Sequence, residues 1–368
     1  MWGSALRYIP VIALSLATLT GAGCASVPQR EFRSYTEAFA EVKNTTEQLL
    51  LEYDAAKRAE DESKGGKKPA PAPGPYPGAV TLSLTVDNGP STDHAGARRQ
   101  ALEVISAFNS VLVSLAEGRK PEEVKSSVES LSSGLSNVAK LVGTNLPIPY
   151  AGQVAALLST VITALDEARN REQFVAALRE AEPIIHGILR LFAQDAQDIY
   201  QIRARQADRL WTNHQDAVAT LVRQMRAVAQ EYTAPTGDQA KELAAIERDV
   251  RGLLDRAGLN QNSEKLQPAT STKPFDELTL SQLQQTLVQA QAEAAQYEAV
   301  IKAQNALFQL VLSYGRLLAQ ADATLTAVRV AVDRPADIRQ QVNELIGVVF
   351  NVKRDWEALN AARRAAAG

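Results

Sequence analysis

Apolar residues recur every three or four positions along nearly the whole chain after Val27, and this spacing constrains the fold more than any other feature. The two most regular stripes lie near the C-terminus, and their gaps alternate between three and four. They are Leu307, Val311, Tyr314, Leu318, Ala321, Leu325, Val328 and Val332, then Ile338, Val342, Leu345, Val349, Val352, Trp356 and Leu359. Such spacing predicts helices that pack through one apolar stripe. We therefore expect an all-α protein, an elongated helical bundle or antiparallel coiled coil with long helices.

Two of the expected helices are unusually long. Helical spacing continues through residues 171–232 and again through residues 281–332, which predicts lengths of roughly 75–90 Å at 1.5 Å per residue. Pro183 is expected to kink the first of them. The final stripe is expected to pack antiparallel on residues 307–332, because the break at Arg334-Pro335 is short.

The first 24 residues read MWGSALRYIPVIALSLATLTGAGC and end on the only cysteine of the chain. One charge, Arg7, precedes an uncharged run that is too short for a membrane-spanning helix, which needs about 20 residues. The segment resembles a bacterial lipoprotein signal, with Gly21-Ala22-Gly23-Cys24 as its lipobox. Gly21 stands where such signals usually carry leucine. The resemblance implies cleavage before Cys24, a diacylglyceryl group on its thiol and acylation of the new amine.

The same resemblance carries implications for location. Ala25 follows the cysteine where aspartate would signal retention, which implies sorting to the outer membrane and a body that faces the periplasm. Two or more acyl chains give a lasting anchor where a single chain would not. The alternative is an ordinary signal peptide cut nearby, which would leave Cys24 as a free thiol.

Composition shifts divide the chain into four expected parts: a signal peptide (1–23), a lipid-anchored N-terminal helix (24–63), a linker with an extended segment (64–90) and an elongated helical bundle (91–368). Residues 64–79, KGGKKPAPAPGPYPGA, favour extended polyproline geometry. We expect this linker to be flexible and the first helix to move relative to the body. Residues 80–86, VTLSLTV, alternate with period two and predict one short extended segment, packed on helices or paired with another chain.

Composition also excludes several classes of function. One cysteine and three separated histidines disfavour intramolecular disulfides and thiolate or imidazole metal sites. A net charge of −3 provides no positive field for nucleic acid. Phosphate-binding loops, nucleophile elbows and zinc-protease motifs are missing from the sequence. We expect no enzymatic activity, no catalytic residues, no cofactor, no metal site and no nucleic-acid partner.

A few polar residues within the long 171–232 pattern are weaker candidates. Asp195 and Asp198 lie one helical turn apart, but Asp195 interrupts the apolar stripe, which favours a structural role. His186 and His214 are interpreted as half-buried surface histidines. Basic and aromatic residues gather nearby and could bind an anion or a partner, although Asp198 and Asp208 favour a solvated face. This candidate patch consists of Tyr200, Arg203, Arg205, Arg209 and Trp211.

Residues 141–165 carry no charge and are split by Pro147 and Pro149. This apolar hairpin weakly resembles the architecture of helical pore-forming toxins. The simpler interpretation is a buried helix–turn–helix, because neither half is long enough to span a bilayer. The sequence therefore predicts a lipid-anchored, periplasm-facing scaffold or adaptor of the cell envelope that binds a protein partner or itself through helical surfaces. The alternative is a membrane-perturbing protein that uses residues 141–165.

Overall fold

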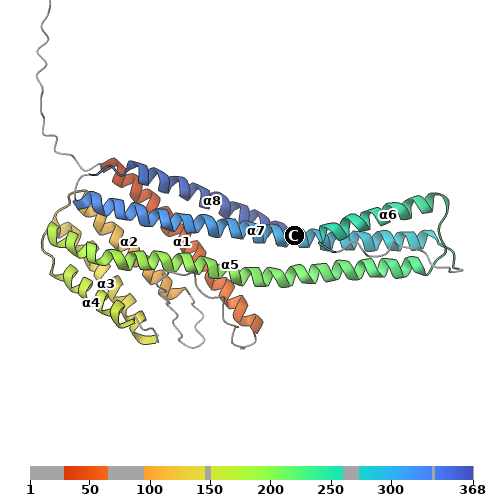
Figure 1. The fold of residues 1–368 in the computed structure, drawn as a ribbon, viewed down its shortest axis with the longest axis horizontal. Coiled ribbons are helices and arrows are strands. Elements are labelled where there is room, and N and C mark those ends of the chain that lie inside the picture. Colours follow the sequence, from red (N-terminus) through yellow and green to blue (C-terminus); the bar gives the residue numbers. More distant parts are fainter. Residues whose placement is uncertain (1–28, 65–94, 146–150, 260–272, 334–335, 368) are drawn as a thin grey trace, which may run out of the picture.

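The computed structural model describes residues 29–64, 95–145, 151–259, 273–333 and 336–367. These ranges form eight helices and contain no strand, which confirms the predicted all-α fold (Figure 1). The lipobox, the linker from residue 65 onward and the extended segment expected at 80–86 lie outside the described residues. The helices are α1 (Gln29–Lys64), α2 (Gly96–Ala116), α3 (Pro121–Asn145), α4 (Ala151–Glu167), α5 (Arg171–Gln230), α6 (Gly237–Arg256), α7 (Glu277–Asp333) and α8 (Arg339–Ala367).

Two long antiparallel helices, α5 and α7, form the axis of an elongated molecule (Figure 1). The 60 residues of α5 correspond to about 90 Å at 1.5 Å per residue. Its start is capped locally, because the Asn170 side chain accepts a hydrogen bond from the backbone N–H of Gln173 at 3.0 Å. Pro183 lies inside α5, and the helix continues through it as one element.

The broad end of the molecule, which we call the head, is built by α1, α2, α3, α4 and α8 around the adjoining halves of α5 and α7 (Figure 1). Its largest fully buried side chains include Tyr35, Phe108, Phe192 and Tyr314. Because Tyr35 belongs to α1, the first helix is part of this core. The expectation that α1 moves relative to the body is therefore wrong. Packing on the bundle removes the apolar stripe of α1 from water, whereas a tethered free helix would leave that stripe exposed.

The narrow end, which we call the tip, has a separate apolar core formed by the end of α5, by α6 and by the start of α7. Between the two cores, α5 has no buried residue from 203 to 217. This stretch forms a waist in the rod, and α1 and α8 both end beside it (Figure 1). The head and the tip are thus linked through the two long helices.

The last helix packs antiparallel on α7, as predicted. Ser313 donates a hydrogen bond to Asp355, and Thr324 donates one to the backbone carbonyl of Gln341 at 3.2 Å. Later positions of α7 therefore contact earlier positions of α8, so the two helices run antiparallel. Val349 is 5% exposed in this seam, so the final stripe belongs to the core of the head.

Candidate functional site

The second half of α1 carries buried or half-buried acids that meet arginines from three other helices close to the waist. We call this group the ionic junction. It consists of Glu52, Asp54 and Glu60 of α1, Arg98 and Arg99 of α2, Asp195, Arg203 and Arg205 of α5, and Arg363 of α8. Figure 1 shows α1 crossing the axis of the rod, and this crossing brings its acids against helices that are distant in sequence.

The most deeply buried pair of the junction is Arg98 with Asp195. Two parallel hydrogen bonds join them, from Nε to Oδ2 at 2.7 Å and from Nη2 to Oδ1 at 2.6 Å. The Arg98 guanidinium also lies 4.3 Å from the centre of the Tyr53 ring, which adds a cation–π contact. Burial raises the pKa of Asp195, and the hydrogen bonds from Arg98 oppose that rise. The fork geometry satisfies both charges and ties α2 to α5 beneath α1.

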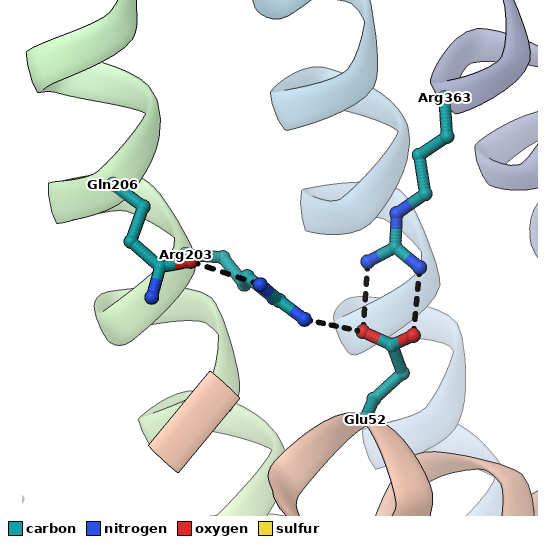
Figure 2. A network of polar contacts seen from close by, with 4 residues as sticks. All are labelled: Glu52, Arg203, Gln206 and Arg363. Atoms are coloured by element: carbon teal, nitrogen blue, oxygen red, sulfur yellow. Dashed lines mark hydrogen bonds and ion pairs between the residues drawn. The ribbon is translucent and has the colours of Figure 1, made fainter. Parts of the chain in front are cut away.

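Glu52 joins three helices at the end of the head (Figure 2). Its carboxylate accepts hydrogen bonds from both terminal nitrogens of Arg363, at 2.7 and 2.8 Å. Arg203 donates a longer one at 3.3 Å and a further bond to Gln206 at 2.9 Å. Burial alone would raise the pKa of Glu52, but the bonds and charges of Arg363 and Arg203 hold it below its usual value. The carboxylate of Glu52 is therefore ionised at neutral pH and is held by both arginines.

The remaining contacts lie further toward the C-terminal end of α1. Glu60 accepts a hydrogen bond from Arg205 at 2.8 Å, and Asp54 accepts one from Arg99 at 2.9 Å. Arg203 and Arg205 thus face α1. The arginines are therefore not a free patch for an external anion, because carboxylates of the same chain pair with both of them, whereas the predicted solvated face holds for Arg205, whose side chain is 53% exposed.

The aromatic members of the candidate patch pack on α7. Tyr200 lies against Phe308, with ring centres 5.3 Å apart, and Trp211 lies against Tyr297 at 6.4 Å. Arg209 is exposed. The predicted patch is therefore divided between contacts to α1, contacts to α7 and solvent.

Both candidate histidines are half-buried, as predicted, and both have carboxylate partners on α7. His186 contacts Asp322, and its other ring nitrogen lies 3.6 Å from Glu182. The hydrogen bond with Asp322 raises the pKa of His186. His214 lies 2.7 Å from Glu293. Asp322 and Glu293 are distant in sequence from the two histidines, so no local pattern could have indicated them, whereas Glu182 lies four positions before His186 on the same helix.

Two further features of the described ranges bear on metal and ligand binding. No group of three or more His, Cys, Asp or Glu side chains within them could hold a metal ion. A cavity of about 470 Å³ opens where α3, α4 and α5 meet, and its lining mixes Val128, Leu165 and Phe174 with charged residues of both signs. This mixture points to no single class of ligand.

The remaining predicted sites fall on undescribed parts of the chain. Cys24 lies outside the described residues, as do most of the side chains of 141–165. No helix among the described residues is long and apolar enough to cross a membrane. Comparison with known proteins adds no assignment, since no family model, curated protein or solved structure matches this chain.

Proposed function

We propose that the protein is a lipid-anchored scaffold of the bacterial cell envelope, facing the periplasm, which holds its tip at a set distance from a membrane. One observation carries the proposal. The candidate lipidation site Cys24 lies five residues before α1, and α1 starts at the end of the head that is farthest from the tip (Figure 1). Five extended residues reach at most about 18 Å, so an acyl anchor at Cys24 keeps this end close to the lipid surface.

The way α1 is held supports a mechanical role. Near its start, Glu31 accepts a hydrogen bond from Arg339 of α8 at 3.1 Å, and Glu41 pairs with Lys353 at 2.8 Å. Its apolar stripe enters the core of the head, and the ionic junction holds its second half. A force on the anchor is therefore shared by α8, α2 and α5. Because α5 runs from the head to the tip, the rod sets the separation between the anchor and the tip.

Loss of the anchor is the first test. Cys24→Ala should release the protein from membranes or leave it unprocessed, because the only thiol able to accept the diacylglyceryl group is removed. Cell fractionation and the mass of the mature protein measure this. A variant that fractionates with membranes and shows the wild-type mature mass would disprove lipidation.

Orientation is the second test. The full lipidated chain is reconstituted in vesicles that carry an acceptor dye in the bilayer. A donor dye is placed either at Arg33→Cys, near the anchor, or at Asp238→Cys, at the start of α6. Strong energy transfer from residue 33 and weak transfer from residue 238 are expected. Equal transfer from both positions would mean that the rod does not stand away from the membrane, and the spacer function would fail.

A further inference from the structure

The rod is thinnest at the waist, between the last contacts of the head and the first contacts of the tip. On the head side, Arg205 of α5 donates a hydrogen bond to Glu60 of α1 at 2.8 Å. On the tip side, Gln215 of α5 donates one to the backbone carbonyl of Ala257, directly after α6, at 2.7 Å. We call the stretch between them, residues 206–213 of α5, the hinge segment. The head adds α1, α2, α3, α4 and α8 to the pair of long helices and the tip adds α6 (Figure 1), so the resistance of the rod to bending is lowest at the hinge segment.

The side chains of the hinge segment make few contacts with the rest of the molecule. None of them is buried, and none forms a hydrogen bond or an ion pair with another helix of the described chain. Trp211 makes a ring contact with Tyr297 of α7. At this level α7 buries Tyr297, Ala299 and Val300, but these three belong neither to the core of the head nor to the tip core. The apolar packing is therefore interrupted on both long helices.

Small and polar side chains occupy the seam between α5 and α7 at the waist. The half-buried side chains of the hinge segment are Gln206, Ala207 and Trp211, and Ala207 brings only a methyl group. The Nε2 atom of Gln206 is buried without a hydrogen-bond partner, and so is the Nε2 atom of Gln304 on α7. A buried N–H without a partner costs about 1–3 kcal/mol. Bending that admits water gives these donors a partner, whereas opening an apolar core would expose apolar area and cost free energy.

We propose that the rod bends at the hinge segment, so that the tip swings relative to the head while both long helices stay intact. Helices in proteins curve with radii down to about 60 Å, so the roughly 12 Å of the hinge segment allow a bend of about 10°. Such a bend moves the far end of α5, roughly 30 Å away, by about 5 Å. The inference goes beyond the proposed function, because a spacer with one bending point keeps its length and still brings its tip to partners that lie off its axis.

Distances between spin labels on the full chain in detergent, measured by pulsed electron paramagnetic resonance, test the hinge. The labels are attached to azidophenylalanine in place of Asn351 in the head and Asp238 in the tip, both exposed, which leaves Cys24 unchanged. A second pair, in place of Asn351 and Glu172, lies wholly within the head and gives the reference width. Packed helices lie about 10 Å apart, so a bend of about 10° in either direction should make the head–tip distribution about 3–4 Å broader than the reference. Equal widths for the two pairs would overturn the proposal.

Matched variants test whether the polar seam is the cause. Gln206→Leu/Gln304→Leu replaces both unpaired donors with apolar side chains, which should join the two cores across the waist and reduce the head–tip distribution to the reference width. Gln197→Leu/Gln309→Leu makes the same change at exposed positions of α5 and α7 within the head and should leave the distribution as broad as in wild type. Trp211→Ala removes the ring contact and should broaden it further. A first variant as broad as wild type, or a control that narrows equally, would reject the polar waist as the hinge.

Discussion

Glu52 of α1 accepts two hydrogen bonds from Arg363 of α8, a residue 311 positions later in the sequence (Figure 2). The pair joins the second half of the first helix of the described chain to the C-terminal end of the last helix. Arg203 adds a contact from α5. Ion pairs therefore hold α1, α5 and α8 together at the end of the head, where the apolar core stops.

Glu52→Gln should lower the free energy of unfolding by about 1–2 kcal/mol, because two charge-assisted hydrogen bonds to a half-buried carboxylate are weakened. Urea unfolding at pH 7 measures this. Asp238→Asn is the control, since Asp238 pairs with Lys241 on an open surface, and it should have almost no effect. Equal effects from the two variants would mean that the junction does not close the head.

The pair of Glu52 and Arg363 also predicts that stability falls at acid pH. The pKa of Glu52 is lower in the folded protein than in the unfolded chain. Its contribution is therefore fully present above its unfolded pKa, about 4.3, and is lost as the pH falls through the folded value. The difference in stability between wild type and Glu52→Gln should shrink in that range. A difference that stays constant from pH 7 down to pH 3 would contradict this.

Asp195→Asn should cost about 3 kcal/mol or more, because it leaves the Arg98 guanidinium buried without its counter-charge. Asp208→Asn on the exposed face of the same helix should change stability by less than about 0.5 kcal/mol. The double variant Arg98→Met/Asp195→Leu removes both charges and should recover most of the loss. Thermal unfolding of the four proteins decides this, and a double variant as unstable as Asp195→Asn would count against an unpaired charge as the cause.

These residues show how far the sequence alone could reach. Asp195 was visible as a polar interruption of an apolar stripe, and the conclusion that it is structural agrees with its burial. Its partner was not visible, because Arg98 lies 97 positions away on a different helix. The long helices could be predicted because their periodicity is local. Which helix crosses which is a property of the assembled core.

The first helix shows the opposite error. The proline and glycine of the linker predict that α1 moves freely, but linker composition describes only the linker. Docking of α1 depends on its own stripe, in which Phe32, Tyr35 and Phe39 are buried. It also depends on acids whose arginine partners come from α2, α5 and α8. The candidate patch is divided between α1 and α7 for the same reason, because its contact partners come from helices that are distant in sequence.

His186 predicts a pH dependence of the opposite sign. The pKa of His186 is raised in the folded protein, chiefly by its hydrogen bond with Asp322, while Glu182 adds to the rise and Arg190 opposes it. Its contribution is therefore fully present below pH about 6.5 and is lost as the pH rises through the folded pKa. Wild type should exceed His186→Gln in stability by about 0.5–1 kcal/mol at pH 6, and by less at pH 9. Urea melts at both values measure this, and a gap that widens with pH would reverse the assignment.

The seam between α7 and α8 gives the last prediction. Val349 is buried there, so Val349→Asp places an unpaired carboxylate among apolar side chains and should cost at least about 3 kcal/mol. Asn351→Asp introduces the same residue at an exposed position of the same helix and should stay within about 0.5 kcal/mol of wild type.

Because the head and the tip have separate cores, Val349→Asp should unfold the head first and leave the tip core intact. Hydrogen exchange should then show protection lost at Leu345 and Leu318 while it persists at Leu283. Uniform loss in both regions would mean that the waist transmits unfolding and that the rod melts as one cooperative unit.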